Sequence, residues 1–225
     1  MPFAHTVEAA RAWVHGWTVS RGAAEPVPNA WGFTIDVGLA GHVMRHVLHS
    51  ADEAIVRKVT EQACAPGVWL KALVPPETLE SWLAPGWRLA GGLGYLMSAP
   101  LPIPHARALD APAGYRPTTW TRAGVTRVLV RTADGAYAAR GQVAVTALGA
   151  VVDQVETDPA HQRRGLGRLV MHRLTAAAAE QGATAGVLGA TPDGRALYET
   201  MGWRSLAPLT GATRDPDWSG HPEER

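Results

Sequence analysis

The chain has 225 residues, of which 46% are hydrophobic and 18% are charged, and its formal net charge is +1. This composition is typical of a globular protein and excludes a disordered or fibrous chain. The small net charge excludes a broad basic surface, so we expect no nucleic-acid partner, and any anion site must be local.

The cysteine content and the absence of a membrane pattern suggest a compartment. The single cysteine, Cys64, excludes an intramolecular disulfide and fits a reducing environment. The first 17 residues lack a basic stretch followed by an apolar core, and no apolar run is long enough to span a membrane. We therefore expect a cytoplasmic protein without a membrane partner. We expect no metal site.

Residues 1–98 contain a series of short helix and strand patterns. Apolar spacing predicts a helix near residues 6–22, with Thr6 as its N-cap. Alternating runs then predict a hairpin over residues 31–48. A helix over 51–67, a buried strand over 68–74, a helix over 75–86 and a final strand or hairpin over 87–99 follow.

A second series follows a stretch rich in proline and alanine. Residues 115–157 predict consecutive strands, with Asp134-Gly135 as a hairpin turn. An amphipathic helix over 166–182, a buried strand over 184–190 and a helix that begins after the cap Thr191 complete the series.

The two series resemble each other at their ends. Pro76 to Gly86 and Pro192 to Gly202 have the same spacing, and each glycine is followed by Trp-Arg. We infer two copies of one βαβαβ-like pattern. The expected domains are residues 1–98 and 114–209, joined by a linker over 99–113 and followed by a polar tail over 210–225.

The sequence "HQRRGLGRLV", residues 161–170, combines three arginines and two glycines at the start of a predicted helix. A helix N-terminus presents unpaired N–H groups, and glycines let an anion approach the backbone. Arginines suit phosphate oxygens, so a phosphorylated ligand is expected. The stretch lacks the Lys-Ser/Thr of a P-loop and the third glycine of a Rossmann fingerprint.

The pattern that matches is Q-x-x-G-x-G, formed by Gln162, Arg163, Arg164, Gly165, Leu166 and Gly167. Together with the preceding "VVDQVETDP" and the later "ATPDGRALYETMGW", it resembles the GNAT superfamily of N-acetyltransferases over residues 114–209. The resemblance implies an α/β fold with a mixed sheet, here as two tandem GNAT-like halves. The first half lacks the loop, so we expect one cofactor site.

The resemblance implies that acetyl-CoA is the co-substrate. The backbone of Val155, Glu156 and Thr157 would pair with the pantetheine arm, and one of its N–H groups would stabilise the oxyanion. The loop from Gln162 to Arg168, with the amides of Arg164 to Arg168, would hold the pyrophosphate. The second half is too short to contain the two helices that border the acceptor pocket in this family, and the first half is a candidate to supply that wall.

Three residues are candidates for proton transfer. Tyr198 matches the tyrosine of the family that protonates the departing thiolate. Asp153 is the preferred base for the acceptor amine, and Glu156 is the second choice. Simple strand alternation places these carboxylates on opposite faces unless a bulge intervenes.

The resulting prediction is an acetyl-CoA-dependent N-acetyltransferase that acts on a primary amine of a small molecule. Two alternatives are a CoA-binding sensor or partner-binding module without catalysis, and an acetyltransferase of protein N-termini or lysines. The oligomeric state is open, with a homodimer as one possibility, and nothing in the sequence identifies the amine.

Overall fold

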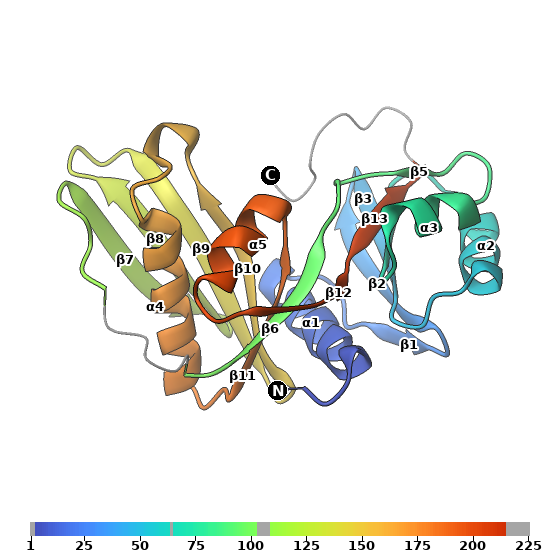
Figure 1. Ribbon diagram of the computed structural model, residues 1–225, viewed down its shortest axis with the longest axis horizontal. Helices are drawn as coiled ribbons and strands as arrows, with labels where there is room; N and C mark the ends of the chain where they lie inside the picture. The colour runs from blue at the N-terminus through green and yellow to red at the C-terminus, as the bar shows by residue number, and fades with distance from the viewer. Residues whose placement is uncertain (1–2, 64, 103–108, 215–225) are drawn as a thin grey trace.

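The chain folds into two mixed β-sheets with helices packed on them (Figure 1). The computed structural model describes residues 3–63, 65–102 and 109–214. The first sheet has the strand order β1-β2-β3-β4-β13-β5, and the second has the order β12-β6-β11-β10-β9-β8-β7. The α/β class and the mixed sheets agree with the prediction.

The first half of the chain follows the predicted order of elements. Its elements are α1 (Thr6–Arg21), β1 (Val27–Asn29), β2 (Gly32–Leu39), β3 (His42–Leu48), α2 (Glu53–Gln62), β4 (Val68–Ala72), α3 (Pro76–Trp82), β5 (Arg88–Leu89) and β6 (Tyr95–Pro100). The N-cap of α1 is His5 and not Thr6, and the Glu8 side chain accepts a hydrogen bond from the His5 amide. The prediction of Thr6 as the cap was therefore wrong by one residue.

The second half also contains the predicted strands and helices. Its elements are β7 (Tyr115–Arg122), β8 (Val125–Thr132), β9 (Tyr137–Thr146), β10 (Gly149–Thr157), the 3-10 helix η1 (Pro159–His161), α4 (Leu166–Glu180), β11 (Ala185–Ala190), α5 (Pro192–Glu199), β12 (Arg204–Pro208) and β13 (Thr210–Thr213). Thr191 caps α5 by accepting a hydrogen bond from the Gly194 amide. Asp134 and Gly135 form the turn between β8 and β9.

The two halves exchange a strand. β6, from the first half, lies antiparallel between β11 and β12 of the second sheet. β13, near the end of the chain, lies antiparallel between β4 and β5 of the first sheet. The two exchanged strands occupy equivalent positions, so the repeat seen in the sequence corresponds to one topology used twice.

This exchange corrects three expectations about the chain. Residues 87–99 do not form a hairpin, because β5 and β6 belong to different sheets. Residues 99 and 100 belong to a strand of the second sheet and not to a linker. Residues 210–213 are a buried strand and not a polar tail, because they complete the first sheet. Arg214 follows this strand, and the rest of the expected tail, residues 215–225, lies outside the described residues.

The helices α1 and α4 cover opposite faces of the second sheet. Adjacent residues of a strand point to opposite faces. Val152 packs in a core with Leu169 and Val170 of α4, whereas the neighbouring Val151 packs in a core with Trp13 of α1. α1 therefore covers the face of the second sheet that the short second half leaves without helices of its own.

Candidate functional site

Two neighbouring parallel strands of the second sheet separate near its centre. β10 and β11 pair only at Ala150–Gly186 and Val151–Val187, although β10 continues to Thr157. Backbone groups of β10 beyond this point have no partner strand on the β11 side within the described residues. The equivalent strands of the first half, β3 and β4, stay paired over five residues from Met44–Val68 to Leu48–Ala72. Only the second half therefore opens a slot in which an extended ligand can add to the sheet.

A β-bulge lies in β10 at this opening. Asp153 pairs with Gln142 and Glu156 pairs with Arg140, so the two residues of β10 between these pairs face a single residue of β9. Gln154 takes the extra position with a φ of 53°. Residues that pair across neighbouring strands point to the same face, and Gln142 and Arg140 are two residues apart. Asp153 and Glu156 thus share a face, because the strand contains the bulge that was named as the exception to simple alternation.

The glycine-rich loop forms the N-terminus of α4. Gly165 is the N-cap with a φ of 80°, and a Cβ atom there would meet no other atom within 4 Å. Glycine adopts this backbone conformation without strain, and the space beside it is open. At Gly167, a Cβ would lie 3.0 Å from a methyl group of Leu197 and 3.7 Å from the Thr157 hydroxyl. The loop is therefore open on one side and packed on the other.

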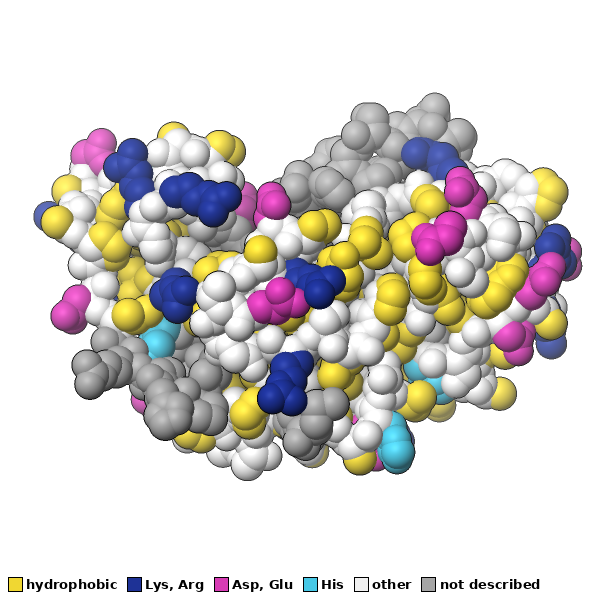
Figure 2. Space-filling model, in the orientation of Figure 1, with side chains coloured by type: hydrophobic (Ala, Val, Ile, Leu, Met, Phe, Trp, Pro, Cys, Tyr) yellow, Lys and Arg dark blue, Asp and Glu magenta, His cyan; other side chains and the backbone are white. Residues whose placement is uncertain are grey.

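The loop is strongly basic. Arg163, Arg164 and Arg168 are exposed, and Figure 2 shows basic side chains over the region where α4 begins. Arg168 donates a hydrogen bond of 2.8 Å to the Thr200 hydroxyl, which fixes it beside α5. The first turn of α4 also contains no acidic residue. Its unpaired N–H groups, the helix dipole and the guanidinium groups together favour a phosphate group at this position.

Tyr198 lies on α5 and is buried in the core of the second half. Its ring is 7% exposed and lies 6.3 Å from the Trp203 ring, centroid to centroid. Burial raises the pKa of the phenol well above its usual range, and the negative charge of Asp153 raises it further. Among the described residues, its hydroxyl has no hydrogen-bond partner. Tyr198 is therefore a protonated phenol at neutral pH.

Asp153 is tied to the end of α1. Its carboxylate accepts hydrogen bonds from Arg21 Nε at 2.6 Å, Arg21 Nη2 at 3.0 Å and Ser20 Oγ at 2.9 Å. The Gln142 amide in turn donates to the Ser20 hydroxyl and carbonyl oxygens. These contacts fix the position of Asp153.

Glu156 has a different environment. It is exposed and forms a 2.9 Å ion pair with Arg140 on the neighbouring strand. Although the bulge places Glu156 on the face of Asp153, it is not among the residues that line the pocket described next. The two candidate bases therefore differ in their surroundings: Asp153 lines the pocket, whereas Glu156 is exposed and paired with Arg140.

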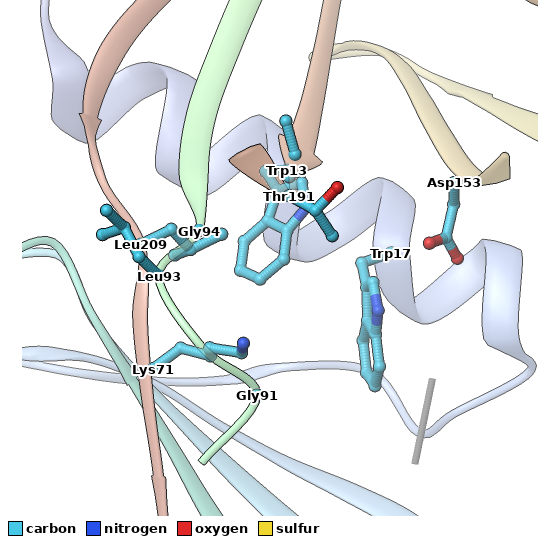
Figure 3. A pocket seen from close by; sticks show the side chains of 11 residues that line it. Trp13, Trp17, Lys71, Gly91, Leu93, Gly94, Asp153, Thr191 and Leu209 are labelled. Atoms are coloured by element: carbon cyan, nitrogen blue, oxygen red, sulfur yellow. The ribbon is translucent and has the colours of Figure 1, made fainter. Parts of the chain in front are cut away.

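A pocket lies between the two halves, next to the opening of β10 and β11. Asp153, Gly189 and Thr191 of the second half line it, together with the tryptophans Trp13 and Trp17 of α1 (Figure 3). Lys71 of β4, Leu93, Gly94 and Leu209 form further parts of its wall. A Cβ at Gly194 would touch both the Thr191 hydroxyl and the Tyr198 ring, so both lie beside Gly194.

The sequence did not identify most residues of this pocket. The sequence contains nine tryptophans, and their number alone does not tell which of them line a site. Nothing in the local sequence marks Arg21, Ser20 or Lys71, because their contacts with the site depend on how the two halves pack. No helix of the described residues is long and apolar enough to cross a membrane. The described residues also contain no cluster of three or more potential metal ligands.

Comparison with known proteins agrees with this architecture. Residues 120–209 match the family described as FR47-like protein. No curated protein matches the sequence of this chain.

Solved structures match the fold over nearly the whole chain. A GCN5-related N-acetyltransferase from Kribbella flavida has a TM-score of 0.63 at 20% identity, over 98% of both chains. A putative GNAT-family acetyltransferase from Novosphingobium aromaticivorans has a TM-score of 0.55 at 21% identity, over 94% of this chain and 97% of the other. A GCN5-related N-acetyltransferase-like protein from Streptococcus suis has a TM-score of 0.57 at 12% identity, over 94% and 93%.

The fold is therefore that of the GNAT acetyltransferases, in a form whose two halves are both matched. The FR47-like match lies in the second half, over residues 120–209.

Proposed function

We propose that the protein is an acetyl-CoA-dependent N-acetyltransferase that modifies a primary amine of a small molecule in the pocket between its halves. One observation carries the proposal. The opened strands, the basic glycine loop and the buried Tyr198 all occur in the second half, and Asp153, at the opening of the strands, lines the pocket.

The residues of the second half fit acetyl-CoA. The open space beside Gly165 and the N–H groups of the first turn of α4 suit a pyrophosphate, with Arg163 and Arg164 next to it. The unpaired edge of β10 from Val155 to Thr157 suits the amide groups of a pantetheine arm. When bound, acetyl-CoA supplies a thioester whose carbonyl carbon forms a bond to the amine nitrogen as its bond to sulfur breaks.

Side chains of the protein donate and accept the protons of the reaction. Tyr198 holds a proton that it can donate to the departing thiolate, because burial and Asp153 keep the phenol neutral. Asp153 is the carboxylate of the pocket and is fixed by Arg21 and Ser20. It attracts the ammonium form of the acceptor and accepts its proton directly or through water. We assign Glu156 no proton transfer, since it is exposed and paired with Arg140.

The pocket favours a small acceptor over a protein. Its wall combines residues of both halves, with two indole rings and Leu209 around a small number of polar groups. Sites for small molecules are concave and mostly apolar, with a few polar groups that fix orientation.

A calorimetric titration with acetyl-CoA and with CoA tests the proposal. We expect one site per chain in the wild type and no binding in the double variant Arg164→Glu/Gly165→Trp. Gly182→Trp is the matched control, because Gly182 also has a positive φ and open space but lies at the other end of α4. Equal loss of binding in both variants would mean that general destabilisation, and not the loop, is responsible. No binding by the wild type would overturn the proposal.

A further inference from the structure

The outer strands β7 and β8 of the second sheet contain four arginines and no acidic residue. Arg116 and Arg122 belong to β7, and Arg127 and Arg131 belong to β8. By contrast, β1 and β2, at one edge of the first sheet, contain neither lysine nor arginine. The concentration of basic residues is therefore a property of this edge of the second sheet.

The arginines of β8 point away from α4. Val128 of β8 lies in the core that includes Leu169 of α4, and α4 covers this face of the sheet (Figure 1). Adjacent residues of a strand point to opposite faces, so Arg127 and Arg131 lie on the other face. On that face α1 packs against β9, β10 and β11, closer to the middle of the sheet.

Strand pairing places the arginines of β7 on the same face. Arg116 pairs with Arg131, and Trp120 pairs with Arg127. Residues that pair across antiparallel strands share a face, and Arg122 follows Trp120 by two positions on the same strand. The four arginines and Trp120 therefore lie together on one side of β7 and β8, and we call this surface the arginine face.

The arginine face has an excess of positive charge. Towards β9, Arg140 is paired with Glu156, so the charges of these two side chains balance. None of the four arginines of the face forms an ion pair with any residue that the structure describes. Three of them are exposed, and Arg127 is half-buried. The face thus presents positive charge that suits an anionic partner.

Two of these arginines lie directly opposite each other. Arg116 and Arg131 form a cross-strand pair, and like charges in this position destabilise a sheet. The Arg131 guanidinium donates a long hydrogen bond of 3.4 Å to the Thr118 hydroxyl. An anion between the two guanidinium groups would remove their repulsion and accept hydrogen bonds from both, which favours a phosphate group here.

Aromatic rings lie beside the arginines. Trp120, which is 41% exposed, pairs with Arg127, and Tyr137, which is 36% exposed, pairs with Arg131 across β8 and β9. Both rings are therefore on the arginine face. Exposed rings next to guanidinium groups provide surfaces on which nucleobases stack.

Other partners fit this surface less well. A second copy of the chain would bring four further arginines onto the face in a symmetric contact and would be repelled. The turn between β7 and β8 consists of Ala123 and Gly124, so it has no bulky apolar side chain to insert into a membrane. An acidic peptide would match the charges but has no flat rings to stack on Trp120 and Tyr137.

From these observations we propose that the arginine face binds single-stranded RNA, with phosphates on the arginines and bases stacked on Trp120 and Tyr137. Single-stranded RNA is often recognised by such stacking on the aromatic rings of an open sheet. The hydroxyl groups of Thr118 and Tyr137 lie on the same face and suit the ribose 2′-hydroxyl, which favours RNA over DNA. The small net charge of the chain gave no sign of such a partner, because strand pairing is what gathers these arginines on one face. The inference goes beyond the proposed acetyltransferase function and does not depend on it.

Fluorescence anisotropy with a 5′-labelled oligouridylate of about 12 nucleotides tests the proposal on the full chain. We expect saturable binding at low salt that weakens as the salt concentration rises. Each phosphate contact with a single strand contributes about 0.7 to the slope of log K against log salt. Four contacts therefore predict a slope of about −3.

Reversing the charge of the cross-strand pair should weaken this binding. We expect Arg116→Glu/Arg131→Glu to lose affinity by about tenfold or more and to reduce the salt slope by about half. Arg11→Glu/Arg57→Glu is the matched control, because it changes the net charge equally at two exposed arginines of the first half. The control should bind as the wild type. Urea denaturation shows that each variant is folded, and Arg116→Gln/Arg131→Gln takes the place of a reversal variant that does not fold.

Two further variants separate stacking from charge and the face from the glycine-rich loop. Trp120→Ala should weaken binding by about fivefold or more with an unchanged salt slope, because stacking on a ring releases no counterions. Arg164→Glu/Gly165→Trp should bind the RNA as the wild type does, since the loop is a different basic site.

Four results would overturn the inference: no binding of the oligouridylate, loss of binding in the loop variant with retention in Arg116→Glu/Arg131→Glu, equal binding of polyglutamate, or equal binding of the corresponding deoxyuridylate strand. Calorimetry with acetyl-CoA on the same variants decides the proposed function separately, because none of the residues changed on the arginine face belongs to the proposed cofactor site.

Discussion

The guanidinium of Arg21 and the carboxylate of Asp153 form a two-point ion pair that links the last turn of α1 to the bulged strand β10. The two side chains are 14% and 13% exposed. The pair connects the half that lacks the glycine-rich loop with the strand at which the second sheet opens. The position of α1, and with it Trp13 and Trp17, is therefore coupled to the candidate catalytic centre.

Replacing Arg21 should destabilise the protein more than replacing an exposed arginine. Arg21→Met leaves Asp153 as a largely buried charge without its main partner, which costs about 3 kcal/mol of unfolding free energy. Arg57→Met is the control, because the Arg57–Glu53 pair is exposed and contributes below about 1 kcal/mol. Urea denaturation of both variants measures the difference. Equal losses would show that the Arg21–Asp153 pair is no stronger than a surface pair.

Replacing Tyr198 by phenylalanine should affect turnover far more than cofactor binding. The variant keeps the ring that packs near Trp203 and removes only the hydroxyl proton. We expect kcat to fall by about 100-fold, the lower range of general acid catalysis, with an unchanged Kd for acetyl-CoA. Steady-state kinetics and calorimetry measure the two quantities. A parallel loss of both would indicate a binding role.

The pH dependence of kcat gives a second test of Tyr198. Because its pKa is raised by burial and by Asp153, the phenol stays protonated throughout the range from pH 7 to 10. We therefore expect no decrease in kcat on the alkaline side up to pH 10. A decrease centred near pH 8 or 9 that is absent in Tyr198→Phe would contradict the assignment.

The exchanged strands should make the first sheet depend on the end of the chain. Ala212 lies in β13, is fully buried between β4 and β5, and packs in the core of the first half. Ala212→Asp places an unpaired charge there and should lower the unfolding free energy by about 3 kcal/mol or more. Ser205→Asp, on the exposed part of β12, is the control. An Ala212→Asp variant as stable as the control would mean that β13 contributes little to the first sheet.

Most local elements of this fold were predictable from the sequence, because each depends on neighbouring residues. The cap at Thr191, the turn at Asp134-Gly135 and the glycine at the start of α4 are short-range signals, and the structure contains all three. The partners of β6 and β13 were not predictable. A short apolar run indicates a strand but does not indicate which sheet receives it, and these strands pair across the boundary between the halves.

The residues of the site also fall into a group that was predictable from the sequence and a group that was not. The loop and Tyr198 belong to a contiguous motif, so the sequence identified them as candidates. The bulge at Gln154 could not be read from a sequence with no glycine at that position. The Arg21–Asp153 contact joins residues 132 positions apart, and the approach of Lys71 depends on the packing of two sheets.

One buried histidine of the first sheet, His46, should make the protein less stable in mild acid. His46 is 8% exposed, its Nδ1 lies 3.0 Å from the Thr34 hydroxyl, and burial lowers its pKa below the ordinary value of 6.5. Above about pH 6.5 the ring is neutral in both the folded and the unfolded chain, and its full contribution to stability is present. As the pH falls below that value, the unfolded chain binds a proton first, so stability decreases down to the lower pKa of the folded state. Burial also lowers the pKa of His15 and His49, which act in the same direction.

Urea denaturation between pH 5 and 8 should show this decrease in stability, and His46→Gln should make it shallower than in the wild type or in a variant of the exposed His5. An unchanged slope in His46→Gln would show that the acid sensitivity has another source.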